Sequence, residues 1–440
     1  MTENFAAMMV DGHRILPALL EDIESAQRAV HLSMFLFFRD PIGEEIAEAL
    51  CRRAAAGVEV RVLLNVEKTA MGDPFSTGEK EMMKHDPDIH YDPTDVTPLC
   101  EKMRAAGVQV QDTNIDYDAA VLVADPRLRS IAEQIRSGIS IDDMHVDHRK
   151  IVVIDGRIGW CGGANIGAQY MYHEPYDPKK DAKAEAEERR KAGLREPWWK
   201  WHDSLTRFEG PIAVALDAHF RDRWVLDGGD DFPPVPTIPG ARPARGRPIH
   251  DARVHCNEPN AKPNDVRELY LRLIRDARRS IFFENPYLYH PAIADALCEA
   301  KAARPDLHVV LVVPAGRHND NAFGQDAQEH EYARYLECGI EVHEYRNHFN
   351  HLKIAVFDER LSVHGSTNLN CRSLEDDKDF ELVVLVDDEE LARWVLEHVR
   401  DVDVARAQRI GEGDLHGTIA GLRKRFRDPR TLALLAKRVL

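Results

Sequence analysis

The sequence predicts an α/β protein of two similar domains, with mixed, mainly parallel sheets packed about a pseudo-twofold axis. Three observations predict it. The chain has 440 residues, which suits more than one domain at roughly 100–200 residues each. Apolar residues alternate between helical and strand spacing, which is typical of βαβ units. The same order of elements then occurs twice, which indicates an internal repeat.

The two copies can be followed element by element. In residues 19–64 a helix with apolar residues at helical spacing leads into a β-branched and aromatic strand, a helix containing Ala-Leu-Cys, and an apolar strand. Residues 271–312 repeat this order, again with Ala-Leu-Cys in the second helix. Each copy continues with a matching piece, residues 103–110 and 336–342, and then reaches a His-x-Lys strand. Two unrelated segments of similar composition would not be expected to keep this order.

Breaks in the pattern suggest the domain boundaries. We expect a first domain over residues 1–226, a linker rich in proline and glycine over 227–248, and a second domain over 249–440 with a basic helical tail. Residues 67–98 and 174–200 are interpreted as insertions on the first domain. They are either lids over a site or solvated segments without function.

Charge and cysteine usage restrict the function classes. Lysine and arginine total 58 against 75 acidic residues, a net charge of −17, which makes nucleic acid an unlikely partner because non-specific binding to it needs positive charge. There is no signal-peptide pattern and no run of the ~18 apolar residues that a membrane span needs. Seven scattered cysteines fit reduced thiols better than a disulfide framework. The sequence therefore predicts a cytoplasmic protein.

One pattern of five residue types carries the chemistry, and it occurs once in each half. The first copy is His148, Lys150, Asp155, Gly162-Gly163 and Asn165, and the second is His351, Lys353, Asp358, Gly365-Ser366 and Asn368. Positions i and i+2 of a strand face the same side, so each histidine points with its lysine. Histidine is a competent nucleophile and acid near neutral pH, and lysines can neutralise phosphodiester oxygens. The pattern predicts phosphoryl transfer that needs no metal.

These motifs resemble those of the phospholipase D superfamily, whose mark is two HxKxxxxDxxxxxxG(G/S)xN-like motifs, one in each half. Residues 195–224 and 365–386 resemble the stretches that follow the two motifs in phospholipases D and cardiolipin synthases. The resemblance covers nearly the whole chain. It implies a pair of α/β domains whose active-site strands meet at a pseudo-twofold interface.

The resemblance also implies a two-step mechanism through a phosphohistidine. His148 is expected to attack phosphorus, and His351 to protonate the leaving alcohol and then to activate water or an alcohol, although the exchanged assignment stays open. The residues expected to hold the phosphate oxygens are Lys150, Lys353, Asn165, Asn368 and Ser366. Asp155 and Asp358 complete the catalytic motifs, and we expect them to support strands and loops. Gly163 replaces the serine of many members, which predicts asymmetric phosphate contacts.

Each histidine would benefit from a carboxylate on its second ring nitrogen. The match suggests Asp203 for one half, and Asp379 or Glu381 for the other. The alternative for these acids is a surface or helix-capping role. Cys161 and Cys371 lie beside the motifs and are interpreted as packing residues.

Substrate is the open question, because the same motifs serve lipases, phosphatidyltransferases and nucleases. The flanking resemblance favours glycerophospholipid headgroups, with hydrolysis or cardiolipin-synthase-type transfer to an alcohol, and no cofactor. A nuclease and a non-catalytic lipid- or phosphate-binding protein are the alternatives. Membrane contact would be peripheral: the basic segment 421–440 either docks on anionic lipid or packs on the second domain. Two motifs in one chain imply that the site does not require an oligomer.

Overall fold

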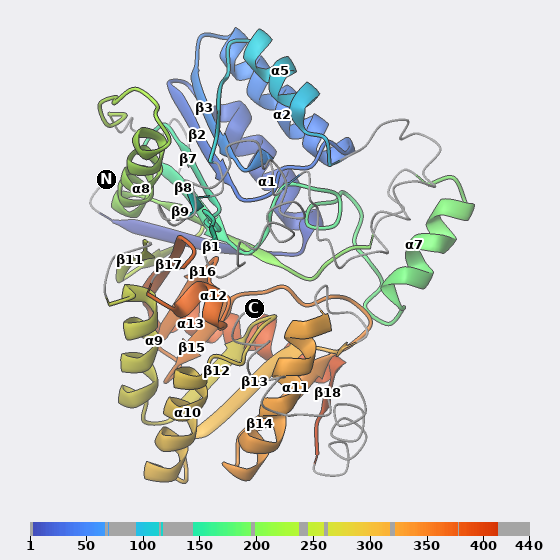
Figure 1. The fold of residues 1–440 in the computed structure, drawn as a ribbon, viewed down its shortest axis with the longest axis vertical. Coiled ribbons are helices and arrows are strands. Elements are labelled where there is room, and N and C mark those ends of the chain that lie inside the picture. The colour runs from blue at the N-terminus through green and yellow to red at the C-terminus, as the bar shows by residue number, and fades with distance from the viewer. Residues whose placement is uncertain are drawn as a thin grey trace.

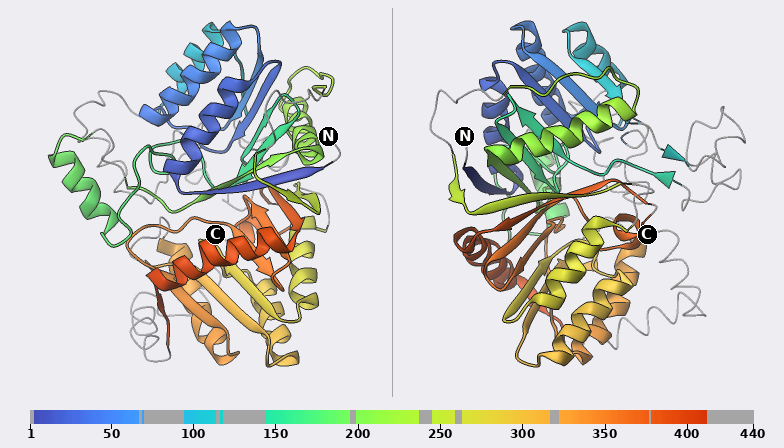
Figure 2. Two further views of the ribbon diagram at one scale, coloured as in Figure 1. Left: turned by 180° about the vertical axis from the view of Figure 1, so that it is seen from behind. Right: turned by 90° about the vertical axis from the view of Figure 1, so that its left-hand side faces the viewer.

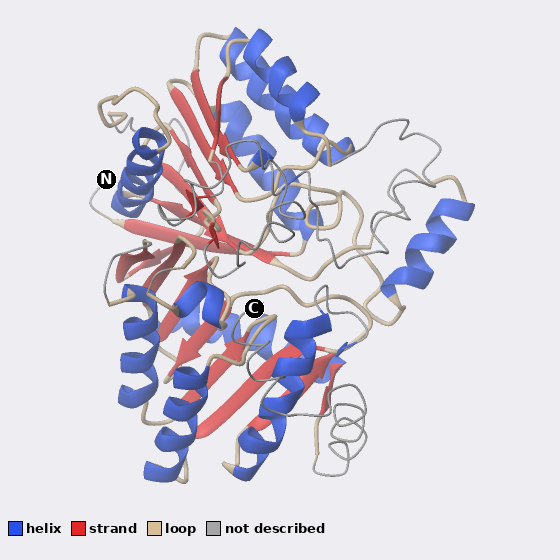
Figure 3. Ribbon diagram, viewed as in Figure 1, coloured by secondary structure: helices blue, strands red, loops and turns tan. Residues whose placement is uncertain are grey.

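The chain folds into two lobes, which lie one above the other in Figure 1. The computed structural model describes residues 3–66, 69, 94–113, 116–117, 144–194, 199–236, 245–258, 263–316, 322–376 and 378–411. An eight-stranded sheet lies at the centre of each lobe. Figure 3 shows the two sheets approaching each other at the middle of the molecule, with helices on their other faces.

The first sheet has the strand order β10-β1-β9-β8-β7-β2-β3-β4. These strands are, in that order, Arg247–Ile249, Asn4–Val10, Ser204–Glu209, Ile158–Gly162, Ile151–Ile154, Ala29–Met34, Glu59–Leu64 and Gln109–Asp112. A separate two-stranded sheet pairs β5 (Asp116–Tyr117) with β6 (Met144–His145).

The second sheet has the order β11-β17-β16-β15-β12-β13-β14-β18. These strands are Asp251–Asn257, Glu381–Asp387, Leu361–Gly365, Ile354–Phe357, Ser280–Glu284, His308–Pro314, Glu341–Tyr345 and Ala407–Arg409. From β1 to β4 and from β11 to β14, the two orders correspond strand for strand. The predicted repeat is therefore a repeat of sheet topology.

The sheets are mixed, as predicted, but the expectation of mainly parallel strands is wrong. Only β2-β3-β4 and β12-β13-β14 pair in parallel, and the other neighbours in both sheets are antiparallel. The reason lies in the motifs. Each His-x-Lys strand, β7 or β15, turns back at Asp155 or Asp358 into an antiparallel partner, and both aspartates have positive φ (53° and 55°).

Helices lie on both faces of each sheet. In the first lobe these are α1 (Gly12–Ser25), α2 (Pro41–Ala55), α5 (Thr97–Ala105) and α8 (Pro211–Leu226). In the second they are α9 (Asp265–Asp276), α10 (Pro291–Ala303), α11 (Ala322–Glu337), α12 (Cys371–Leu374), α13 (Glu389–Val395), the π-helical turn η3 (Leu396–Arg400) and α14 (Asp401–Arg406). Figure 2 shows α13 to α14 crossing the back of the second lobe, opposite α9 and α10. Within the described residues, no helix has the length and apolar character that crossing a bilayer requires.

The chain leaves the first sheet later than the expected linker suggests. β10 begins at Arg247 and still pairs with β1, and β11 begins at Asp251 in the second sheet. Within the segment 174–200, α7 (Ala182–Lys191) stands away from both sheets in Figure 1. Most of the expected insertion at 67–98, and the whole of the basic segment 421–440, lie outside the described residues.

The structure corrects the cysteine prediction. Cys298 of α10 and Cys338, just after α11, form a disulfide with Cα atoms 5.4 Å apart. The remaining cysteines are not disulfide-bonded. Forty positions separate the two partners, and only the packing of α10 against α11 brings them together, so spacing along the chain gave no sign of the pair.

A shared hydrophobic cluster joins the lobes. Residues from β7, β8, β9 and α8 of the first lobe pack with residues from β17 and α13 of the second: Ile151, Val153, Cys161, Phe208, Ile212, Leu216, Leu382, Val384, Val386 and Leu391. Each sheet is therefore buried on both faces, which explains why the motif strands read Ile-Val-Val-Ile and Ile-Ala-Val-Phe without polar alternation. The interface is a continuous core, and it places the two motifs opposite each other.

Candidate active site

Each motif histidine lies directly before its strand, on a segment that is hydrogen-bonded to the opposite lobe. The amide of His148 donates to the carbonyl of Phe380 at 3.0 Å. In the other half, the amide of His351 donates to the carbonyl of His202 at 2.7 Å. These bonds accompany isolated bridges across the interface. The backbone of one lobe therefore sets the position of the histidine of the other.

The carboxylates are exchanged between the lobes in the same way. Nδ1 of His148 lies 2.9 Å from Oε1 of Glu381, and Nδ1 of His351 lies 2.7 Å from Oδ2 of Asp203. Both acids are fully buried. An ionised carboxylate can only accept in these contacts, so with both acids ionised each histidine carries its proton on Nδ1 and presents Nε2 to the site. This geometry suits nucleophilic attack at one histidine and proton transfer at the other.

Two buried lysines complete the cationic part of the site. Nζ of Lys150 donates to the carbonyl of His148 at 2.6 Å. Nζ of Lys353 lies 2.9 Å from the carbonyl of His351 and 3.0 Å from Nε2 of the same histidine. Each lysine is thus held beside its histidine by the i, i+2 relation that the sequence predicts. Both ammonium groups can donate to the oxygens of an anion bound between the histidines.

Burial sets the protonation of the site. Burial lowers the pKa of His148, and the charge of Lys150 lowers that pKa further. Burial also lowers the pKa of His351 well below its usual range, and Lys353 and Lys150 add to the shift. Burial also lowers the pKa of Lys150 to about 7, and nearby Lys353 disfavours its charge. At neutral pH the unliganded site therefore holds neutral imidazoles, the state in which Nε2 can attack.

The two carboxylates differ in the direction in which their pKa values are shifted. Burial raises the pKa of Asp203 to about 7, and Lys353 and an amide hydrogen bond from Ser204 oppose this rise only in part. Burial would raise the pKa of Glu381 as well, but the neighbouring His148 and Lys150 outweigh it and hold that pKa below its ordinary value. The pseudo-twofold site is thus electrostatically asymmetric.

Asp155 and Asp358 are placed by the structure away from the histidine side chains. The carboxylate of Asp155 accepts the amides of residues 27–29, at 2.7–3.2 Å. That of Asp358 accepts the amides of residues 278–280, at 2.6–3.0 Å. Each therefore ties the end of its motif hairpin to the start of the neighbouring strand, β2 or β12, in keeping with the expected support role.

The amide and hydroxyl groups expected to bind phosphate differ in whether other protein groups already hydrogen-bond them. Oδ1 of Asn165 accepts the amide of Leu36 at 3.0 Å, which orients its side chain, whereas Oδ1 of buried Asn368 has no hydrogen-bond partner among the described residues. The hydroxyl of Ser366 hydrogen-bonds Glu381 and accepts the amide of Leu382 at 3.1 Å. It is therefore directed at a carboxylate and not at the expected phosphate position. At Gly163, its counterpart, a Cβ would lie 2.3 Å from Oδ1 of Asp203.

Of the two acids considered for the second half, the structure selects Glu381. Asp379 instead accepts the amide of Val146 at 3.0 Å and pairs with Arg372. Sequence reasoning also missed Ser373, whose hydroxyl lies 2.5 Å from Oε1 of Glu381, and Phe35, whose ring packs edge-on against His148 with centroids 4.8 Å apart. Neither residue belongs to a motif, so no spacing pointed to them.

The fold and the crossed histidine–carboxylate pairs define a two-lobed protein whose two motifs meet between its lobes. Residues 19–175 and 270–402 match a family model described as "Cardiolipin synthase, PLD-like domain". The chain therefore belongs to this family of phospholipase D-like proteins. The match contains both motifs and excludes residues 176–269, which include the segment with Asp203.

Relatives agree with this assignment, and a solved structure shares the fold. The chain is 24% identical over 409 residues to the "Probable cardiolipin synthase YwiE" of Bacillus subtilis, covering 91% of this chain and 66% of the relative. It is 25% identical over 369 residues to a cardiolipin synthase of Geobacillus thermodenitrificans, covering 83% and 60%. The chain thus spans under two thirds of the length of these relatives. The fold matches phosphatidylserine synthase of Haemophilus influenzae with a TM-score of 0.62 at 14% identity, covering 99% and 97% of the two chains.

Proposed function

We propose that the protein is a phospholipid phosphodiesterase or phosphatidyltransferase that acts on glycerophospholipid headgroups through a phosphohistidine. The observation that carries the proposal is the pair of histidines, each held by a buried carboxylate of the opposite lobe and each beside a buried lysine. The names of its relatives, cardiolipin synthases, support a phospholipid as the substrate. The acceptor is water in hydrolysis or an alcohol in transfer.

The first step forms a bond between phosphorus and Nε2 of His148 and breaks the bond between phosphorus and the leaving alcohol oxygen. The departing oxygen takes a proton from His351. The pKa of His351 is low in the free site, and the negative charge of a bound phosphodiester raises it toward the range in which it can serve as an acid. Glu381 stabilises the charge that develops on His148 during attack, because it accepts from Nδ1.

In the second step, water or an alcohol gives its proton to His351 and attacks phosphorus, and the phosphorus–nitrogen bond breaks. His148 returns to its neutral state and the site is restored. Lys150 and Lys353 neutralise the non-bridging oxygens in both steps, with the amide groups of Asn165 and Asn368 beside them. All of these residues come from one chain, so an oligomer is not required.

We further propose that the protein works at a membrane surface by peripheral contact, because its substrate is a lipid. A cytoplasmic location is the expectation from the sequence. The Cys298–Cys338 disulfide weakens the part of that expectation that rests on cysteine usage, since disulfides are rare in a reducing cytosol.

Mass spectrometry of products tests the function. The purified protein is incubated with phosphatidylglycerol vesicles, with and without glycerol or ethanol, beside the His148→Ala variant. Phosphatidic acid alone identifies hydrolysis, and cardiolipin or an alcohol-exchanged lipid identifies transfer. If the wild type and His148→Ala give the same lipid profile, the lipid proposal fails, and the same pair of proteins is then tested on oligonucleotides.

A further inference from the structure

A buried histidine of the second lobe makes only one long polar contact from its ring among the described residues. His290 precedes α10, its side chain is 4% exposed, and within the described part of the chain neither ring nitrogen makes a hydrogen bond of good geometry. Nε2 lies 3.5 Å from Oε1 of Glu375. A ligand nitrogen of His290, the sulfur of buried Cys371 and a carboxylate oxygen of Glu375 all lie within 4.8 Å of one another. An imidazole buried in this way is costly unless something binds it.

The internal repeat provides a comparison for this position. In the first lobe the residue before α2 is Asp40, which accepts the amides of Ile42 at 3.0 Å, Gly43 at 2.9 Å and Ala168 at 2.6 Å. Bridges at Phe37–Ile166 and Leu288–Leu369 place Ala168 and Cys371 two residues after the bridge in each lobe. Asp40 stands three residues after its bridge and His290 two, and each directly precedes the first residue of its helix. The second lobe thus has a histidine before its helix where the first has an aspartate that caps the helix.

We propose that His290, Cys371 and Glu375 bind a zinc-class divalent ion, with solvent as its fourth ligand. Imidazole nitrogen, thiolate sulfur and carboxylate oxygen are the ligands that zinc prefers. Binding replaces the thiol proton with a sulfur–metal bond and releases that proton. Glu375 is half exposed, with 49% of its side chain accessible, so ion and solvent can enter from its side. The thiolate and carboxylate offset the charge of the ion, which the positive end of α10 would otherwise disfavour.

Such an ion would position part of the active site without touching substrate. Cys371 and Glu375 flank Ser373 in the chain. The hydroxyl of Ser373 donates a hydrogen bond to Glu381, the acid that contacts His148. Fixing this turn to the start of α10 would hold that hydroxyl in place. This inference does not depend on which substrate the enzyme uses.

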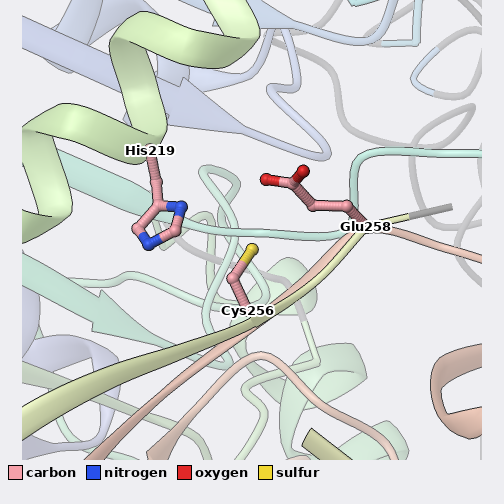
Figure 4. A group of neighbouring side chains, drawn as sticks. All are labelled: His219, Cys256 and Glu258. Atoms are coloured by element: carbon pink, nitrogen blue, oxygen red, sulfur yellow. The ribbon is translucent and has the colours of Figure 1, made fainter. Parts of the chain in front are cut away.

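A second trio of the same residue types provides an internal control. His219 of α8 and Cys256 and Glu258, in β11 and just after it, point toward one another in Figure 4, across the boundary between the lobes. There, however, a guanidinium nitrogen of Arg149 donates to the sulfur of Cys256 at 3.6 Å. A cation already faces that thiol, so we do not assign a metal to this trio.

Cobalt is the probe, because a bound thiolate gives it an intense near-ultraviolet charge-transfer band and four-coordination gives it strong visible bands. Metal-free, full-length protein is titrated with Co²⁺, and Zn²⁺ is then added to displace it. We expect both bands to saturate at one ion per chain in the wild type and in Cys256→Ser, and to be lost in Cys371→Ala. His290→Asp paired with Cys371→Ala copies the first-lobe cap, and we expect this variant to be folded and to lack both bands.

Two outcomes overturn the proposal. One is a wild-type protein that gives no thiolate–cobalt band. The other is a band that survives Cys371→Ala and disappears in Cys256→Ser, which would assign the metal to the trio in Figure 4. Because the readout is spectroscopic, a failure here leaves the proposed function standing, and inactivity toward lipids leaves the metal site standing.

Discussion

Replacing Glu381 with glutamine tests the crossed carboxylate directly. The substitution keeps the shape of the side chain and removes the charge that faces Nδ1 of His148 at 2.9 Å. Two unit charges at that distance attract by roughly 6 kcal/mol at an effective dielectric constant of about 20. A hydrogen bond to a charged group is worth about 1.5–3 kcal/mol. At about 1.4 kcal/mol per factor of ten, these two energies bracket a fall in kcat/KM of about 10- to 10⁴-fold.

The assay is the initial rate of phosphatidylglycerol conversion, with circular dichroism and Tm to establish that each variant is folded. Asp379→Asn is the matched control, since it neutralises a buried carboxylate two residues away that contacts Arg372 and the amide of Val146. Ser373→Ala removes one hydrogen bond to Glu381, and we expect roughly a tenfold loss or less. A folded Glu381→Gln protein within threefold of wild type, or one no worse than Asp379→Asn, would refute the reasoning.

Further predictions concern the roles of the remaining motif residues. Because the pKa of Lys150 is about 7 and phosphate binding needs its charged form, kcat/KM should fall as pH rises through about 7, and a flat profile from pH 6 to 9 in the rate assay would contradict this. With a phosphatidyl ester whose leaving group needs no acid, His351→Ala should still give a burst of leaving group while His148→Ala gives none; the reverse result exchanges the two roles. Asp358→Ala should lower the free energy of unfolding by about 1–3 kcal/mol in urea denaturation and leave kcat/KM of the folded enzyme within about threefold, because its carboxylate accepts backbone amides. Gly163→Ser should reduce kcat/KM at least tenfold by displacing Asp203, and retained activity with an unchanged Tm would show that the site absorbs the side chain.

Much of the architecture could be predicted because repetition carries information that a single segment lacks. Matching positions in two halves indicated one sheet per half and a site built from both motifs, and the strand orders correspond accordingly. The direction of most strands could not be predicted. An apolar run such as Ile151–Ile154 has no alternation, since both of its faces are buried, and so gives no sign of whether its neighbour is parallel.

The choice between Asp379 and Glu381 was also beyond the sequence. Two acids at i and i+2 of an extended segment face the same side, so alternation does not separate them. The difference is tertiary: Arg372 and the amide of Val146 occupy Asp379, and His148 faces Glu381. The buried environment of Lys150 likewise depends on the closure of two lobes and not on neighbours in the chain.

The exchange of carboxylates between the lobes also determines how a substitution in one lobe affects the other. We expect a substitution of Asp203 to impair His351 and a substitution of Glu381 to impair His148, because each carboxylate contacts the histidine of the opposite lobe. We therefore expect a change in either lobe to lower the activity that depends on the histidine of the other. The rate of turnover should therefore report on the contact between the lobes. We expect mild denaturant that separates the lobes by a fraction of an ångström to stop the reaction while both sheets are still intact.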